Sequence, residues 1–323
     1  MLRLILTFVS GVGLFLFGIY TIDKCFDKNY SLSPKTEKLF GKPFFSFVCG
    51  VFSAAITQSS SAINSVLTAL RDKEKITEKT TFFAIAGSNI GTTATAYLAL
   101  MQNVSVGAIF SSLVFFSVLF LMLTKKEKNK KYALAVSGFS VIFISFSIIK
   151  NAVPELVKNI RPDFLFSPNP FVPFFVCLIL TALCQSSSLV SVLIISFAKI
   201  NALTLPNALF MIMAANIGTC STIFLVSLGK TKKSVRVATF NFIFNLIPAI
   251  FFIVAYYSRL LDFFLGLNVA MDTKIALFHT LFNVVACFLV CPFIGWFIDE
   301  NVVEKEKRYY FLPKKKPAVK KRA

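Results

Sequence analysis

The sequence predicts an all-α polytopic membrane protein with two inverted-topology repeats, each containing a re-entrant helical hairpin. Three observations lead to this prediction. Apolar residues make up 56% of the 323 positions and charged residues only 15%. Apolar windows of about 17 to 25 residues, long enough to cross a bilayer as helices, recur along the chain. A string of uncharged polar residues, Gln-Ser-Ser-Ser, interrupts two of these windows.

The two Gln-Ser-Ser-Ser strings belong to a longer duplication. An Asn-Ile-Gly-Thr string follows each of them, beginning at Asn89 and Asn216, and in both copies 31 positions separate the Gln from the Asn. Two four-residue strings at one fixed offset indicate a duplicated membrane unit. The residues of the two polar strings are Gln58, Ser59, Ser60 and Ser61 in the first copy and Gln185, Ser186, Ser187 and Ser188 in the second.

Repeat 1 is predicted to cover residues 1–124. The apolar run 44–70 has Gln58 near its centre, so a single helix would place four polar groups at mid-bilayer. Two half-helices of about 13 residues each would instead reach about 20 Å, past the middle of a roughly 30 Å core. We therefore predict a re-entrant hairpin over 44–70. The other spans of the repeat are expected over about 4–22, 81–101 and 105–123.

Repeat 2 is predicted to cover residues 132–298, after a basic cytoplasmic linker at 125–131. The pattern restarts there, with a second re-entrant hairpin over about 171–198. A basic tail, 299–323, is expected to be disordered or to rest on anionic lipid. The other spans of the repeat are expected over about 132–149, 205–228, 236–257 and 275–297.

The distribution of Lys and Arg favours this topology over one in which each polar run crosses the membrane once. With the N-terminus outside and both hairpins re-entrant, 27 of the 34 Lys and Arg lie in cytoplasmic segments, as the positive-inside rule requires. The two hairpins then enter from opposite sides, so the duplication is inverted. We expect a multi-pass protein of the cell membrane with a cytoplasmic C-terminal tail. The net charge of +19 is explained by these loops, so no nucleic-acid partner is expected.

The tips of the hairpins have the composition of an anion site. A tip exposes the unpaired N–H groups of its second half-helix, and the serines add hydroxyl donors. Neither hairpin contains Lys, Arg, Asp, Glu or His within 44–70 or 171–198, so no side chain neutralises a bound anion. A bound cation would compensate for that charge, and neutral hard oxygen ligands suit sodium. The candidate sodium ligands are Ser88, Asn89, Thr92, Thr93, Asn216 and Thr219.

These paired motifs resemble the type II sodium-phosphate (Na+/Pi) cotransporter family and its bacterial relatives. Gly13-Leu14-Phe15-Leu16-Phe17-Gly18 is also similar to the opening helix of that family, and the resemblance runs from about residue 11 to about 298. It implies sodium-driven import of inorganic phosphate, and the inverted repeats predict transport by alternating access. The two tips would hold phosphate, and the Asn/Thr regions with Asn89 and Asn216 would contribute to the substrate and sodium sites. The second copy departs from the first, since Cys220 follows Thr219 where Thr93 follows Thr92.

Several alternatives remain at this stage. A symporter of another oxyanion or of a small organic anion fits the same donors, because hydroxyl and N–H donors do not separate phosphate from arsenate or sulfate. A channel and a membrane-embedded enzyme are alternatives of other classes, but the apolar spans supply no nucleophile, base and orienting acid. No prosthetic group is expected, and a homodimer is one alternative for the assembly.

A second sequence echo links the last two spans. Residues 236–245 and 274–283 share Ala, Phe, Phe and Asn in register, which aligns Asn245 with Asn283 and Asn241 with His279. Asn245 and Asn283 either line the pathway or form hydrogen bonds between neighbouring helices. His279, the one histidine of the sequence, is interpreted as a buried bundle residue rather than a proton carrier.

Overall fold

The computed structural model describes residues 2–25, 42–72, 74, 76–101, 104–160 and 163–298. These residues form helices joined by short connections, and no strand occurs among them, which confirms the all-α class. The predicted tail 299–323 lies outside the described residues, as do residues 26–41 between the first predicted span and the first predicted hairpin.

The first half of the chain contains two helices that are broken where the sequence carries its polar motifs. Gln58 separates α3 from α4, and Thr93 separates α5 from α6. The helix after α7 begins at Glu127, so most of the predicted linker 125–131 is helical. The helices are α1 (Leu2–Cys25), α3 (Pro43–Thr57), α4 (Ser60–Asp72), α5 (Glu78–Thr92), α6 (Ala94–Leu100), α7 (Val104–Leu123) and α8 (Glu127–Ile160).

The second half repeats this order of breaks. Gln185 separates α9 from α10, and Thr219 separates α11 from α12. The elements are a 3-10 turn (Asp163–Phe166), α9 (Phe171–Cys184), α10 (Ser187–Lys199), α11 (Leu205–Gly218), α12 (Cys220–Ser227), α13 (Lys232–Ala255), a π-helical turn (Tyr256–Leu260), α14 (Leu261–Gly266), α15 (Met271–Val290), a second 3-10 turn (Cys291–Phe293) and α16 (Ile294–Phe297).

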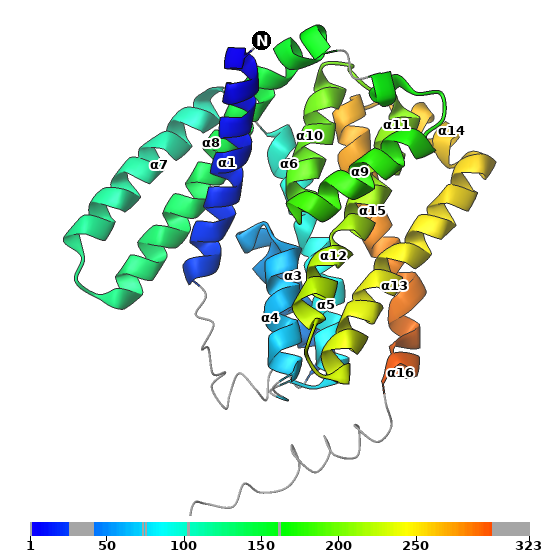
Figure 1. The fold of residues 1–323 in the computed structure, drawn as a ribbon, viewed down its shortest axis with the longest axis horizontal. Helices are drawn as coiled ribbons and strands as arrows, with labels where there is room; N and C mark the ends of the chain where they lie inside the picture. The colour runs from blue at the N-terminus through cyan, green and yellow to red at the C-terminus, as the bar shows by residue number, and fades with distance from the viewer. Residues whose placement is uncertain are drawn as a thin grey trace, which may run out of the picture.

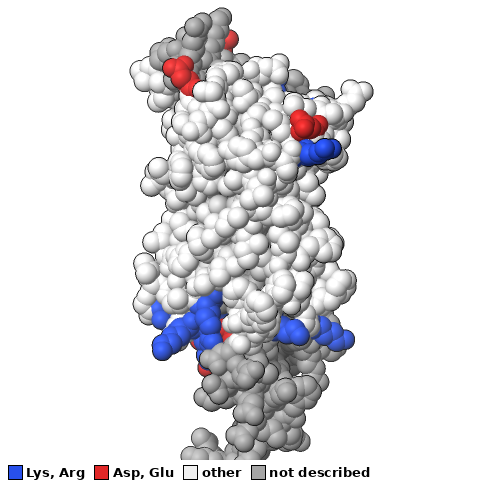
Figure 2. Space-filling view, turned by 90° about the vertical axis from the view of Figure 1, so that its right-hand side faces the viewer, with Lys and Arg blue, Asp and Glu red and all other residues white. Residues whose placement is uncertain are grey.

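The length and composition of the helices are those of a multi-pass membrane protein. Four described stretches are long and apolar enough to cross a membrane. The space-filling view agrees, because a broad middle band of the face shown carries no charged side chain and Lys and Arg gather at its lower edge (Figure 2). The four stretches are Asn129–Ile149, Leu205–Ser227, Lys232–Gly266 and Met271–Phe297, and shorter apolar helices cover Leu2–Gly18, Pro43–Thr57, Ile109–Leu123, Phe171–Cys184 and Ser187–Lys199.

The helices are arranged in two connected groups (Figure 1). Helices α1, α7 and α8 pack together at the left of the view, and the remaining helices form the main bundle. Within that bundle, α3 and α4 lie in the lower half and α9 and α10 in the upper half. Helices α13 and α15 extend over both halves, so they pass beside the level at which the two shorter helix pairs meet.

Glycines allow the broken helices to pack closely on the spans beside them. A Cβ at Gly50 of α3 would lie 2.1 Å from the Ala84 carbonyl oxygen of α5, and one at Gly87 would lie 2.0 Å from the Phe47 carbonyl oxygen. In the second half, a Cβ at Gly218 of α11 would lie 2.7 Å from the Thr181 Cβ of α9. Small residues therefore set the α3–α5 and α9–α11 distances, as is usual for helices packed within a membrane.

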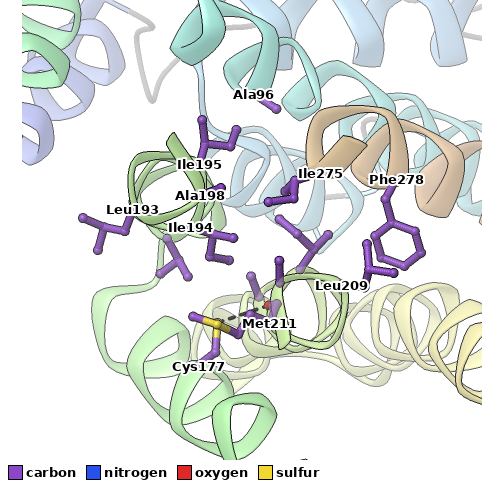
Figure 3. Packing of buried hydrophobic residues seen from close by; sticks show 14 of the residues in the cluster. Ala96, Cys177, Leu193, Ile194, Ile195, Ala198, Leu209, Met211, Ile275 and Phe278 are labelled. Carbon is purple, nitrogen blue, oxygen red and sulfur yellow. Dashed lines mark hydrogen bonds between the residues drawn. The ribbon is translucent and has the colours of Figure 1, made fainter. Parts of the chain in front are cut away.

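A large buried apolar cluster holds α9, α10, α11 and α15 together (Figure 3). Ile195 and Ala198 of α10 belong to it together with Leu209 of α11 and Ile275 of α15. At its edge the Cys177 thiol donates to the Met211 carbonyl oxygen at 3.1 Å. This packing fixes α10, which begins at the second polar motif, against α15.

Candidate functional site

Each Gln-Ser-Ser-Ser string lies at a break between two helices. Gln58 ends α3 with φ 56° and ψ 24°, and Gln185 ends α9 with φ 53° and ψ 27°. Both residues thus adopt the left-handed conformation that commonly ends a helix, here without glycine. The serines that follow lie at the start of a new helix, which begins at Ser60 in the first copy and at Ser187 in the second.

The first serine of each string caps that new helix. The Ser59 Oγ accepts a hydrogen bond from the Ala62 N–H at 3.1 Å, and the Ser186 Oγ accepts one from the Leu189 N–H at 3.2 Å. Serine is a preferred N-cap because its oxygen satisfies one of the N–H groups left unpaired at a helix start. The two strings therefore have one local geometry, and the remaining N–H groups of the first turn face the break.

The two breaks meet each other in the middle of the main bundle. The Ser188 Oγ donates to the Gln58 carbonyl oxygen at 2.8 Å, across 130 positions of sequence. The Thr95 Oγ1 of α6 donates to the Gln58 Oε1 at 2.7 Å and contacts the Ser188 Oγ at 3.4 Å. The structure thus brings the two predicted tips together and adds Thr95, which is fully buried, between them.

Thr95 was not among the residues that the sequence predicted for the site. It lies three positions after Thr92, just beyond the first Asn-Ile-Gly-Thr string, in the first turn of α6. The second copy has Thr222 at the corresponding position in α12, so the duplicated register could have indicated both residues.

The middle and last serines differ in how much of their hydrogen-bonding capacity is used. Ser60 and Ser187 are buried, yet their hydroxyls make no hydrogen bond to another described residue, and the same holds for the hydroxyl of Ser61. Ser188, by contrast, is bonded to Gln58. The hydroxyls of Ser60, Ser61 and Ser187 are therefore the donors at the tips that remain available for a bound anion.

The two glutamines have different environments despite their equal position in the repeats. Gln58 is fully buried, and its Nε2 donates to the Ala55 carbonyl oxygen in addition to the bond from Thr95. Gln185 is exposed, and no side-chain partner of it occurs among the described residues. The two tips thus differ in the exposure of the glutamine, whereas the serines of the second string are all buried and Ser59 and Ser61 of the first are partly exposed.

The asparagines of the two Asn-Ile-Gly-Thr strings, Asn89 and Asn216, occupy equivalent positions near the ends of α5 and α11. The Asn89 Nδ2 donates to the Ile85 carbonyl oxygen at 3.0 Å, and the Asn216 Nδ2 donates to the Ile212 carbonyl oxygen at 2.8 Å. Both side chains are buried. Since each amide nitrogen bonds back along its own helix, each side-chain oxygen is directed away from that bond.

The predicted sodium ligands are buried around these two helix ends. The Thr92 and Thr219 hydroxyls donate to the Asn89 and Asn216 carbonyl oxygens at 2.7 and 2.6 Å. A hydroxyl that donates its hydrogen retains lone pairs, so both oxygens can still ligate a cation. The other two hydroxyls behave in the same way: Thr93 donates to the Ile90 carbonyl oxygen at 2.7 Å, and Ser88 donates to the Asn64 Oδ1 at 2.7 Å.

A buried amide network connects this region to the second half of the chain. The Asn241 Oδ1 of α13 accepts from the Asn89 Nδ2 at 3.4 Å and from the Asn64 Nδ2 at 3.5 Å. Its own Nδ2 donates to the Cys220 sulfur at 3.3 Å. Cys220, which departs from the Thr93 pattern, therefore contributes to a network across four helices. Asn64 and Asn241 are further residues that the sequence did not indicate for the site.

Charged side chains of the described residues gather at the ends of the bundle rather than at the tips. At one end Glu78 is fully buried, with its Oε1 3.0 Å from the Arg236 Nε and its Oε2 3.9 Å from the Arg71 Nη2. Nearby, the Thr231 and Ser234 side chains donate to the Asp72 carboxylate at 2.6 and 2.8 Å, and these bonds hold the pKa of Asp72 below its ordinary value. This end of the bundle therefore joins the α4–α5 turn to the start of α13.

An apolar bundle in which the polar ends of two helix pairs meet near its centre defines a class: membrane transport proteins, which bind a solute inside a membrane-spanning bundle. The family follows from comparison with known sequences. The chain belongs to the Na+/Pi-cotransporter family, whose family model matches residues 14–151 and 164–273. This is a family of transporters rather than of enzymes.

Individual relatives share about a quarter of their aligned residues with the chain. The chain is 25% identical to the uncharacterized protein YqeW of Bacillus subtilis (strain 168) over 300 residues, which cover 91% of this chain and 94% of YqeW. It is 23% identical to the "Putative inorganic phosphate export protein YjbB" of Escherichia coli (strain K12) over 267 residues, 81% of this chain and 48% of YjbB. The chain thus spans about half the length of YjbB. No solved structure gives a significant match.

Proposed function

We propose that the chain is a sodium-coupled transporter of inorganic phosphate that works by alternating access. The observation that carries the proposal is the contact between the two tips, in which Ser188 bonds to the Gln58 carbonyl oxygen. Serine hydroxyls and first-turn N–H groups from both halves then surround one position, as a tetrahedral oxyanion requires. The substrate-binding residues are Gln58, Ser59, Ser60, Ser61, Gln185, Ser186, Ser187, Ser188, Asn89 and Asn216.

Sodium coupling follows from the absence of charge at the tips. Dipoles and hydroxyls alone leave the charge of a bound phosphate uncompensated in a poorly solvated interior, which is costly. A co-bound sodium ion supplies the missing charge. Its ligands in the proposal are the side-chain oxygens of Ser88, Asn89, Thr92, Thr93, Asn216 and Thr219, and the family name supports sodium as the coupled ion.

Alternating access in this proposal depends on inverted repeats, 1–124 and 132–298, whose helix pairs α3–α4 and α9–α10 are re-entrant hairpins. The matched order of helix breaks at Gln58, Thr93, Gln185 and Thr219 supports a repeat. Because 27 of the 34 Lys and Arg fall in the segments assigned to the cytoplasm, the N-terminus is placed outside and the tail inside.

The direction of phosphate movement has two candidates. An inward sodium gradient favours import, which the resemblance of the sequence implies. The printed name of YjbB describes phosphate export for that relative, and this name favours a second candidate in which the chain carries phosphate outward. The same tips and cation ligands serve either direction, because the gradients decide the net flux through a coupled carrier.

Uptake of radiolabelled phosphate into proteoliposomes tests the proposal. The purified chain is reconstituted and given an inward sodium gradient or, as the control, an equal potassium gradient. The proposal predicts accumulation above equilibrium with sodium alone. Preloaded vesicles diluted into sodium-free and sodium-containing buffer measure the outward flux in the same preparation. Equal fluxes in sodium and potassium would contradict coupling and favour a channel.

A further inference from the structure

Three buried polar side chains near the second tip have polar atoms without partners among the described residues. They are Ser191 of α10 and His279 and Asn283 of α15, and each is at most 1% exposed. The Ser191 Oγ, both ring nitrogens of His279 and the Asn283 Oδ1 make no hydrogen bond within the described part of the chain. Buried polar atoms in native structures nearly always have a partner, so this group indicates a bound ligand or water.

The packing of α10 on α15 places these side chains relative to the tip. Ile195 of α10 and Ile275 of α15 belong to the same buried cluster, and the two helices are in contact (Figure 3). The helices run in opposite directions, α10 away from the tip and α15 past it (Figure 1). Helix α6 relates α15 to the tip: its Thr95 contacts the tip residue Ser188 at 3.4 Å, and two positions further the Tyr97 hydroxyl lies 2.9 Å from the Thr280 Oγ1 of α15. His279 and Asn283, on either side of Thr280 in the sequence, therefore lie near the level of the second tip, and Ser191 lies one turn along α10 from Ser187.

The orientation of Asn283 is fixed by its own helix. Its Nδ2 donates to the His279 carbonyl oxygen at 3.1 Å, so the hydrogen-bonding capacity that remains is that of the Oδ1, an acceptor. A neutral imidazole at His279 offers one further acceptor and one donor, and Ser191 offers both. These three side chains therefore add acceptors beside a tip whose serine hydroxyls and N–H groups offer donors.

Acceptors give the site a way to distinguish oxyanions that donors cannot provide. Hydrogen phosphate and hydrogen arsenate carry a protonated oxygen at neutral pH, whereas sulfate carries none. An acceptor in the site accepts a hydrogen bond from the protonated oxygen of phosphate or arsenate. Beside sulfate the same acceptor has no donor to pair with, and it repels the negatively charged sulfate oxygen. We propose that Asn283, together with His279 and Ser191, forms a subsite that receives the protonated oxygen of the substrate and so selects phosphate and arsenate against sulfate. This inference rests on the proposed function.

Competition with phosphate uptake tests the subsite. In the proteoliposome assay, unlabelled arsenate should inhibit phosphate uptake nearly as well as unlabelled phosphate does, and sulfate should inhibit it far more weakly. Asn283→Leu removes the acceptor at similar side-chain size. The inhibition constant of sulfate divided by that of phosphate should fall by about three- to tenfold in this variant, which corresponds to the loss of one neutral hydrogen bond. Ser140→Ala on α8, which alters another buried serine without a described partner, is the control and should keep the ratio.

Asn283→Asp separates recognition from packing. It keeps the acceptor and should reject sulfate at least as strongly as the wild type, even where the added charge weakens phosphate uptake. His279→Leu provides a second test if Asn283→Leu does not fold, and it should also lower the ratio. An unchanged ratio in the leucine variants, with sodium-driven phosphate uptake intact, would overturn the subsite and leave the transporter standing. Absence of uptake by the wild type would instead overturn the proposed function.

Discussion

At the scale of single residues, Thr95 determines how the two tips are held together. Its hydroxyl donates to the Gln58 Oε1 at 2.7 Å and lies 3.4 Å from the Ser188 Oγ, and no part of the side chain reaches solvent. Gln58 in turn accepts from Ser188 through its backbone carbonyl. One threonine from α6 thus contacts a residue from each tip, so its substitution should change both the stability of the protein and its transport activity.

Thr95→Val should destabilise the protein by about 1–3 kcal/mol, because it leaves the buried Gln58 Oε1 without its donor. Thermal unfolding of the purified protein in detergent measures this effect. Thr95→Ser keeps the hydroxyl and should restore most of the lost stability. Equal unfolding temperatures for the valine variant and the wild type would show that the bond contributes nothing.

At the scale of elements, glycines determine how closely α3 and α5 approach each other. Gly87 of α5 faces the Phe47 carbonyl oxygen of α3, and Gly50 of α3 faces the Ala84 carbonyl oxygen of α5. Both contacts are with backbone atoms, which cannot move aside as a flexible side chain could. The α3–α5 distance, and with it the position of the first tip, therefore depends on the absence of side chains at these positions.

Gly87→Ala should destabilise the protein by roughly 1–3 kcal/mol or more, since a Cβ 2.0 Å from a carbonyl oxygen forces the two helices apart. Gly13→Ala is the matched control, because a Cβ at Gly13 would meet nothing within 4 Å. Unfolding temperature and the yield of monodisperse protein report the difference. If the two variants behaved alike, close α3–α5 packing would not limit stability.

The sequence predicted the elements better than their contacts. Apolar windows identified the helices, and the polar strings marked where they break, because both features are local in the chain. The contact of Ser188 with Gln58, the position of Thr95 between them and the Asn241 network join residues far apart in sequence. Such contacts depend on helix packing, which hydropathy does not encode. The unequal exposure of Gln58 and Gln185 could not be predicted from the Gln-Ser-Ser-Ser string, since both copies share it.

At the scale of the whole molecule, polar groups connect the two halves at one end of the bundle. Asp72 at the end of α4 accepts from the Thr231 and Ser234 hydroxyls beside the start of α13. Close by, the Glu74 carboxylate pairs with Lys233, and the buried Glu78 pairs with Arg236. These bonds hold the α4–α5 turn against the start of α13.

The Asp72 bonds should make stability depend on pH on the acid side. Because the folded protein lowers the pKa of Asp72, its contribution is fully present above the pKa of the unfolded chain and is lost as pH falls through the folded pKa. Asp72→Asn should therefore reduce the loss of thermal stability on acidification below about pH 5. Unfolding temperatures across a pH series measure it, and parallel curves for the two proteins would contradict this role.

The central claim is that the two tips form one phosphate site, and direct binding tests it most simply. Equilibrium dialysis of radiolabelled phosphate against the purified chain, in sodium and in potassium, is compared for the wild type, Ser60→Ala and Ser187→Ala. Ser196→Ala is the control, because its hydroxyl already bonds to the Val192 carbonyl oxygen. We predict sodium-dependent binding that falls at least about tenfold in either tip variant and persists in the control. Undiminished binding in both folded tip variants would contradict the claim.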